Sequence, residues 1–424
     1  MRSLLPCILL LLTAVSLQAQ KFRAMGEIRE RSEYDRRPDA AGEDVFHLLR
    51  TRFGLEATLE NELTAFIELQ DARGFGDTHT GAVTGGEESL TGLRQGFFQA
   101  RHIGGSPLGV KVGRQVLSYG NELLLGASEW SNFGQTFDAA VIRTELDDLT
   151  VDLMGGAIAQ RPNRLVYAPD AFLIGAWSTW TPARTGASIH GFYLFDDPRN
   201  TAARQNRHTL GTHISGAWSG FDYSLDGALQ LGDMYFSESG VDRLPIFAHM
   251  AGTRLGYTFD SSLALRIGVA WNYLSGNPPG RSDAYRAFST LYSTSHLHFG
   301  SMDYFDDVPR VTEGRGLQSL SAQASVSPLE NLQLSAALHL FSLTRDPVDE
   351  AAGDPATQPG TPLLRYSRAI GNEMDFAISY DVLEWLQLSG GYSIFQGDPD
   401  RYILRGTNTA RWAFFSARAR FSSE

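Results

Sequence analysis

The segment HLLRTRFGLEATLE, which spans residues 47–60, alternates between two kinds of side chain. In an extended chain, successive side chains point to opposite faces. One face is mostly apolar and carries Leu49, Thr51, Phe53, Leu55, Ala57 and Leu59. The other face carries Arg50, Arg52, Gly54, Glu56 and Thr58. A strand of this kind suits a sheet with one apolar side and one side in contact with water.

Similar period-two segments recur along the chain, which is typical of outer-membrane barrels. Short polar turns are expected at residues 60–62, 104–109, 147–148, 182–186, 220–222, 260–262, 328–331 and 382–384. Longer connections rich in Gly, Pro and Asp occur at residues 74–91, 198–207, 275–310 and 345–367. This alternation predicts an all-β fold, a transmembrane up-and-down antiparallel β-barrel of about 18 strands with short periplasmic turns and long extracellular loops. A first strand is expected over residues 22–34 and a closing strand near 408–421.

Residues 1–20 have the features of a secretory signal peptide, with a basic Arg2, an apolar run from Leu4 to Leu12 and small or polar residues up to Ala19. The barrel is then expected to comprise residues 21–424, in the bacterial outer membrane. The one cysteine, Cys7, lies inside the signal segment. Disulfide scaffolds, thiol catalysis and cysteine metal sites are therefore not expected in the mature chain.

The charge of the chain limits the classes of partner. The 424 residues carry a net charge of −12, which gives no electrostatic footprint for nucleic acid. Of the 36 basic residues only Lys21 and Lys111 are lysines, so almost all positive charge is guanidinium. Arginine is well suited to forked contacts with carboxylates.

Aromatic residues stand beside the expected short turns, namely Trp180, Trp218, Tyr257, Phe259, Tyr380 and Trp385. Amphipathic rings favour the level of the lipid headgroups, so these positions predict an interfacial girdle. Ordinary core packing is the alternative explanation for any single ring.

Alternation also assigns residues to the lumen. Closing the barrel makes the first two strands and the last one neighbours, so one wall is expected to carry Arg23, Arg29, Arg31, Arg50, Arg52, Arg418 and Arg420. Arg254 and Arg266 lie on the polar face of a later hairpin. The lumen acids are expected to be Glu27, Glu56 and Glu68, with Glu373 and Asp375 as further members. Such arginines lower the barrier to anions, or they form an Arg/Glu lattice that only stiffens the barrel.

Common motifs for catalysis and cofactor binding are absent from the sequence. The sequence contains no G-x-S-x-G, no H-E-x-x-H and no glycine-rich phosphate loop, so neither an enzyme nor a bound cofactor is predicted. Calcium is a possible ligand of the acidic stretches at residues 303–307 and 346–354. Neither stretch has the spacing of an EF-hand, which favours a solvated acidic loop instead.

A resemblance to a known family is carried by VGRQVLSYGNELLLG, residues 112–126, followed by Trp130, Gly134, Phe137 and Asp138. Together with residues 50–73 it resembles the alginate export family of outer-membrane porins. The resemblance implies a monomeric 18-stranded barrel that passes a polyanionic uronate polymer through an arginine-rich lumen. Arg114 and Asp138 match the family and are expected at the pore. Leu123 and Gln135 stand where family members often carry arginine.

These observations predict an outer-membrane porin that passes anions or an anionic polysaccharide such as an alginate-like polyuronate. The alternatives are a general diffusion porin and a barrel that serves as an adhesin or structural anchor. The expected partners are an anionic saccharide or small anion, outer-membrane lipid and lipopolysaccharide, and the barrel insertion machinery. Of the long connections, residues 275–310 form the longest candidate for a segment that plugs the pore.

Overall fold

The computed structural model describes residues 21–37, 43–59, 63–76, 90–160, 171–198, 204–235, 243–280, 283–347, 366–404 and 408–423. The predicted signal peptide at residues 1–20 lies outside these ranges, as does most of the acidic stretch 346–354. No helix among the described residues is long and apolar enough to cross a membrane.

The strands are β1 (Lys21–Arg36), β2 (Asp44–Thr58), β3 (Leu63–Phe75), β4 (Leu90–Ala100), β5 (Leu108–Gln115), β6 (Thr136–Leu146), β7 (Leu149–Gln160), β8 (Ala171–Trp180), β9 (Ala187–Pro198), β10 (Arg204–Trp218), β11 (Phe221–Tyr235), β12 (Arg243–Thr258), β13 (Arg266–Leu274), β14 (Leu317–Leu329), β15 (Leu332–Leu343), β16 (Ala369–Leu383), β17 (Leu386–Gly397) and β18 (Thr409–Ser422). Among the described residues, three short helices accompany them, namely η2 (Ile103–Gly105), η3 (Ser295–Leu297) and α2 (Val308–Val311).

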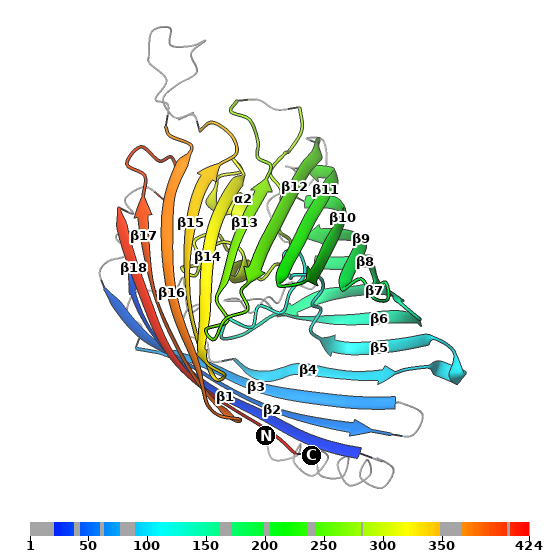
Figure 1. Ribbon diagram of the computed structural model, residues 1–424. Helices are drawn as coiled ribbons and strands as arrows, with labels where there is room; N and C mark the ends of the chain where they lie inside the picture. The colour runs from blue at the N-terminus through cyan, green and yellow to red at the C-terminus, as the bar shows by residue number, and fades with distance from the viewer. Residues whose placement is uncertain are drawn as a thin grey trace.

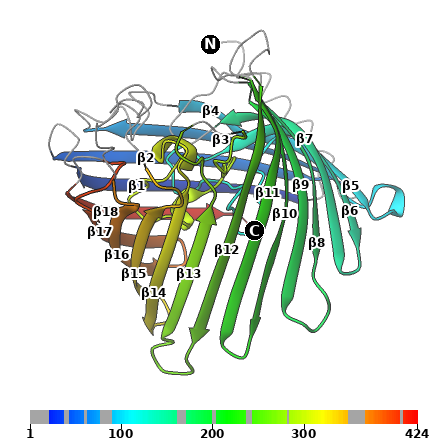
Figure 2. The ribbon, with the colours of Figure 1, turned by 90° about the horizontal axis from the view of Figure 1, so that it is seen from above.

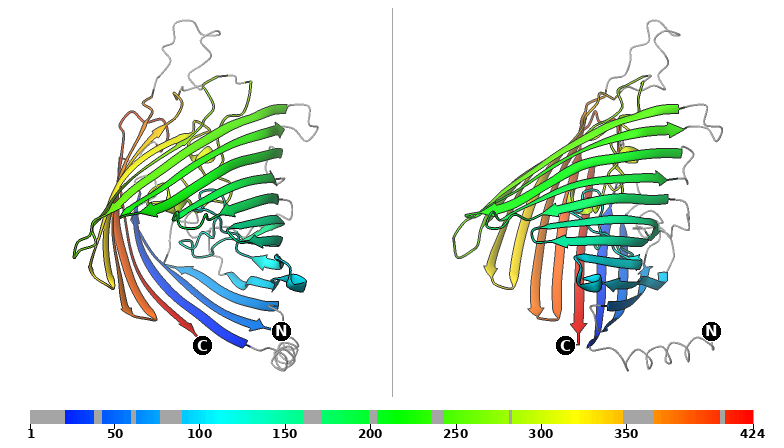
Figure 3. Two further views of the ribbon diagram at one scale, coloured as in Figure 1. Left: turned by 45° about the vertical axis from the view of Figure 1, so that its right-hand side comes forward. Right: turned by 90° about the vertical axis from the view of Figure 1, so that its right-hand side faces the viewer.

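The strands form one closed antiparallel barrel, as predicted. Each strand pairs with its neighbours in the chain, and β1 also pairs with β18, so that the 18-stranded sheet has no free edge (Figure 1). Arg29 of β1 lies opposite Arg418 of β18 in this register. Closure satisfies the backbone groups that an open edge would expose to lipid. The two strands run side by side in both views of Figure 3.

The expected turns also occur at one end of the barrel, here called the turn end; the other is the loop end. The turn predicted at residues 60–62 lies outside the described residues, and the other seven fall within a few residues of connections between paired strands. Trp180, Trp218 and Trp385 are exposed at the turn end, with 77% of Trp218 accessible. They are not packed in a core, which supports the girdle interpretation.

Two connections fold into the barrel from the loop end. Residues 116–135, between β5 and β6, form the first inward loop, and residues 275–280 and 283–316, between β13 and β14, form the second (Figure 2). The loops join through their backbones, because Gly126 N–H donates to Tyr292 O at 2.9 Å and Tyr292 N–H donates to Leu124 O at 3.0 Å. The buried apolar cluster of the protein therefore lies inside the barrel, where Leu125 and Phe299 are covered.

The second inward loop is fixed to the opposite wall by a buried acid. Glu373 of β16 is inaccessible to solvent, and its Oε1 accepts the N–H of Met302 at 2.9 Å. Gly300 has a φ of 86°, and a Cβ there would lie 2.6 Å from Glu373 Oε1. Only glycine combines this backbone conformation with so close an approach.

We predict that the closure of the barrel can be trapped with a disulfide. Ile28 faces Ala419 across the β1–β18 pair, and facing residues of antiparallel strands lie within disulfide range. Ile28→Cys combined with Ala419→Cys should oxidise completely in the mature chain, as measured by thiol titration. Ile28→Cys combined with Leu386→Cys is the control, because β18 separates these positions. A barrel that is open between β1 and β18 would leave both pairs reduced.

Candidate functional site

Five arginines gather on the lumen side of the first strands, and we call them the arginine cluster. They come from β1, β2 and β4 and are only 1–8% exposed: Arg29, Arg31, Arg50, Arg52 and Arg94. Alternation places the four arginines of β1 and β2 there, because Ile28 and Phe53 on the opposite faces of these strands are exposed on the outside of the barrel. The first inward loop covers the cluster, and the left view of Figure 3 shows this loop between the β1–β3 wall and the opposite strands.

The cluster binds three successive backbone carbonyls of the first inward loop. Arg29 Nη1 donates to Glu129 O at 2.9 Å, and Arg50 Nη1 donates to Ser131 O at 3.0 Å. Arg31 Nη1 donates to Trp130 O at 2.6 Å. A backbone segment inside a barrel lacks a neighbouring strand, so these guanidinium groups supply the donors that a strand would supply elsewhere.

Four carboxylates neutralise most of the cluster. Glu27 Oε1 lies 2.6 Å from Arg50 Nη2, and Glu68 Oε2 lies 2.8 Å from Arg94 Nη1. The remaining two ion pairs link Glu33 with Arg31 at 2.6 Å and Glu129 with Arg52 at 2.7 Å. Five guanidinium groups thus face four carboxylates, which leaves one positive charge in excess.

Glu129 is the one acid that reaches the cluster from the loop. Its side chain is 48% exposed and contacts Arg52 and Arg94. Desolvation would raise the pKa of this carboxyl, but Arg94, Arg52 and Arg50 outweigh it and lower the pKa to about 2. Glu129 is therefore ionised at neutral pH and closes the loop over the wall.

Trp130 connects the cluster with the second inward loop. The guanidinium of Arg31 lies 3.9 Å from the centre of the indole, and the ring of His296 stacks on the indole at a centroid distance of 4.3 Å. Gln135 strengthens the same junction, because its Nε2 donates to Gly126 O and Tyr292 O, both at 2.8 Å. Gln135 thus serves as a buried link between the loops at a position where family members often carry arginine.

Sequence reasoning missed Arg94 and Glu129. Strict alternation does not place both Arg94 and Gln95 in the lumen. The β3–β4 register shifts between Glu68 and Leu69, and as a result both of these adjacent side chains contact Glu68. Glu129 lies on a connection, and the local pattern carries no signal that this connection turns inward.

The other arginines predicted to line the lumen lie outside the arginine cluster. Arg418 donates to Gln387, and Arg420 lies 3.4 Å from Glu27 with 59% of its side chain exposed. Arg23 donates to Ser422 at 2.7 Å near the turn end, and Glu56 lies opposite Arg23 in the β1–β2 register. Arg254 and Arg266 are on β12 and β13, outside the cluster, where they contact His298 and Asp222.

The prediction that Arg114 and Asp138 line the pore is wrong. They are register partners on β5 and β6 and form an ion pair of 2.7 Å. Their side of the sheet also carries the exposed Val112 and Ile142, whereas Phe137 on the other side is fully buried. Alternation therefore directs both charged side chains out of the barrel, close to its loop end.

The lumen contains cavities on both sides of the first inward loop. One of about 390 Å³ lies toward the loop end beside Arg31, Trp130 and Arg310. Another of about 420 Å³ lies toward the turn end beside Glu27 and Arg420.

For the acidic stretches the sequence favours a solvated loop over a calcium site. In the part of the chain that the structure describes, no three His, Cys, Asp or Glu side chains are grouped to hold a metal ion. Asp303 instead contacts His296 at 2.9 Å, and Asp306 pairs with Arg310 at 2.9 Å.

Comparisons with known proteins agree with this architecture. A family model described as alginate export matches residues 19–399. No protein of curated function matches the sequence. Among solved structures, a BenF-like porin from Pseudomonas fluorescens Pf-5 is 12% identical with a TM-score of 0.65, and the match covers 96% of this chain and 100% of that chain.

Two Pseudomonas aeruginosa barrels are similar to the same extent. OccK11 (OpdR) is 15% identical with a TM-score of 0.61, over 96% of this chain and 98% of that chain. OccK2 (OpdF), solved in complex with glucuronate, is 10% identical with a TM-score of 0.61, over 96% of this chain and 100% of that chain. At these identities the likeness shows the fold.

We predict that Glu129→Gln loosens the first inward loop. Glutamine has nearly the same shape as glutamate but no charge, so it loses the ion pairs with the guanidinium groups. The loop should then open more often, and the rate at which maleimide labels a Ser131→Cys reporter should rise roughly tenfold. Glu330→Gln, in the turn between β14 and β15, is the matched control and should leave the rate unchanged. Equal rates in both variants would show that Glu129 does not hold the loop.

The same carboxylate predicts a response to acid. A lowered pKa means that ionised Glu129 stabilises the loop fully above its ordinary pKa of 4.5 and loses this effect as the pH falls toward 2. Single-channel conductance should be constant from about pH 7 to about pH 5 and change below that. The change should be absent in Glu129→Gln, and an identical acid response in that variant would contradict the assignment.

Proposed function

This chain belongs to the alginate export family, and we propose that it conducts anions or an anionic saccharide through an arginine-lined lumen. The family and the 18-stranded fold indicate a transport channel of the bacterial outer membrane rather than an enzyme. The proposal concerns the charge preference and the ligand class of that channel.

The observation that carries the proposal is an excess of guanidinium groups in the arginine cluster and in the two β18 arginines beside it. Arg418 contacts the neutral amide of Gln387, and Arg420 has only a long contact of 3.4 Å with Glu27. That carboxylate is already paired with Arg50 at 2.6 Å. With these two residues added, seven guanidinium groups face the four carboxylates of the arginine cluster. A surplus of positive charge along a wet pore favours anions over cations.

The arginines have two different tasks in this proposal. Arg29, Arg31 and Arg50 are buried and bound to loop carbonyls, so they hold the first inward loop. Arg418 and Arg420 are more accessible and can approach a passing carboxylate. A guanidinium binds a carboxylate through a fork of two hydrogen bonds. Shallow sites of this kind attract an acidic saccharide without trapping it.

The solved barrels support the choice of ligand class. OccK2, which shares the fold, was solved with bound glucuronate. Glucuronate is a saccharide acid, and its carboxylate is the group that the lumen arginines are suited to bind. The family description likewise concerns export of alginate, an acidic polysaccharide.

We predict that the accessible arginines determine ion selectivity. Arg418→Gln combined with Arg420→Gln should lower the anion-to-cation permeability ratio about two- to fivefold in planar bilayers, because the double substitution removes two positive charges from the lumen. The control is Arg73→Gln combined with Arg114→Gln, which removes two arginines from acid pairs outside the lumen. Folding is checked by heat-modifiable migration.

The outcomes of this experiment distinguish the proposed anion channel from a general diffusion porin and from an adhesin or structural anchor. An unchanged ratio in the lumen variant, or an equal fall in the control, would contradict the proposed role of Arg418 and Arg420. Current that saccharide acids do not block would indicate a general diffusion porin. A folded barrel with negligible conductance would indicate an adhesin or a structural anchor.

A further inference from the structure

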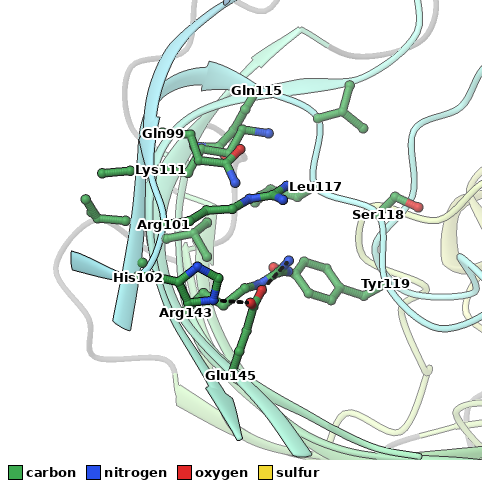
Figure 4. A pocket seen from close by; sticks show the side chains of 15 residues that line it. Gln99, Arg101, His102, Lys111, Gln115, Leu117, Ser118, Tyr119, Arg143 and Glu145 are labelled. Atoms are coloured by element: carbon green, nitrogen blue, oxygen red, sulfur yellow. Dashed lines mark ion pairs between the residues drawn. The ribbon is translucent and has the colours of Figure 1, made fainter. Parts of the chain in front are cut away.

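A third cavity lies inside the barrel, away from the arginine cluster. Its volume is about 270 Å³, and it is enclosed by the inner face of β4, β5 and β6 and by residues 117–119 of the first inward loop (Figure 4). Arg101, Lys111 and Arg143 line it from the wall, and Arg101 extends across it toward Leu117. This volume is near the lower end of the range for small-molecule sites, so it suits one sugar unit rather than a polymer.

The cavity gathers positive charge that the chain leaves partly uncompensated. The ammonium group of Lys111 rests 3.9 Å from the centre of the Phe97 ring, and no carboxylate among the described residues pairs with it. Arg101 likewise forms no ion pair with any acid that the structure describes. Arg143 is different, because its Nε and Nη2 donate to Asp152 at 2.7 and 2.6 Å.

The carboxylates nearby do not balance these cations. Asp152 is bound by Arg143 and also accepts the Tyr119 hydroxyl at 2.8 Å. Glu145 is the other acid, and it lies 4.0 Å from Arg143 Nη1 and 3.6 Å from His102 Nε2. Three cationic side chains therefore face two carboxylates, which leaves one positive charge in excess. Both carboxylates contact Arg143, so neither Lys111 nor Arg101 pairs with an acid among the described residues. Arg101 is exposed, whereas Lys111 is half-buried. A half-buried ammonium group without a counter-ion is costly, and a bound anion would remove that cost.

We propose that this cavity is a binding subsite for the carboxylate of a single saccharide acid. Lys111 and Arg101 bind the carboxylate, and the Gln99 amide, which lies beside Lys111 in Figure 4, is placed to bind a sugar hydroxyl. The subsite is separate from the arginine cluster, since it lies on β4–β6 and contains a lysine. The choice of a saccharide acid rests on the proposed function, whereas the cationic cavity does not.

The two lysines of the chain allow a local test. Full-length mature protein in detergent is acetylated with an amine-reactive ester, and peptide mass spectrometry follows Lys111 and Lys21 separately. Replacing sodium chloride with sodium glucuronate at constant ionic strength should slow acetylation of Lys111 at least about fivefold. Lys21, the first residue of β1, is the internal control, and its rate of acetylation should not change. Glucose, which lacks the carboxylate, should protect neither lysine.

Variants test the partner residue. Arg101→Gln should abolish the protection of Lys111, whereas Arg73→Gln, which removes an arginine outside the lumen, should preserve it. Calorimetric titration with glucuronate gives a second measurement that does not depend on lysine reactivity. Lys111→Gln should weaken binding about tenfold or more, and Lys21→Gln should leave it unchanged. Equal affinity in both lysine variants would overturn the subsite.

The result is independent of the test of pore selectivity. An anion-selective channel in which glucuronate leaves both Lys111 acetylation and the Lys111→Gln affinity unchanged would overturn the subsite alone. Protection of Lys111 in a barrel without anion preference would support the subsite and contradict the proposed selectivity.

Discussion

The interior of this barrel depends on one contact, in which guanidinium groups of β1 and β2 bind the backbone carbonyls of residues 129–131. A loop that enters a barrel carries polar backbone groups that have no neighbouring strand. Arginines that such a loop covers carry charge that water no longer solvates. Each group satisfies the other, at distances of 2.6–3.2 Å. The second inward loop then builds on the first through the Gly126–Tyr292 backbone pairing and the stacking of Trp130 on His296.

Because of this contact, an arginine-rich wall does not by itself indicate a preference for anions. Buried arginines that hold a loop are largely neutralised by Glu27, Glu33, Glu68 and Glu129, so their number alone is a poor measure of selectivity. The buried cluster forms the stiffening lattice considered from the sequence. The proposed function assigns the anion path to different residues, Arg418 and Arg420, which lie outside that cluster.

Much of the fold could be predicted because the period of a strand is two. The strand count, the turn positions and the inward direction of Arg29 and Arg50 all follow from alternation and from closure. Alternation fails at Arg94, where the shifted register directs two consecutive side chains inward. Arg114 was assigned to the pore from the family resemblance, although its spacing of two from the apolar Val112 indicates the outward face. The inward course of the two loops depends on contacts between residues more than 100 positions apart, such as Gln135 with Tyr292, and no local pattern encodes them.

The central claim is that the lumen prefers anions. The most direct test is the reversal potential of the refolded mature chain in a planar bilayer under a potassium chloride gradient. The account predicts a potential of the sign set by chloride, and a current that falls when glucuronate is added. A potential of the sign set by potassium would contradict it, because the surplus of lumen guanidinium groups would then have no effect on the ions that pass.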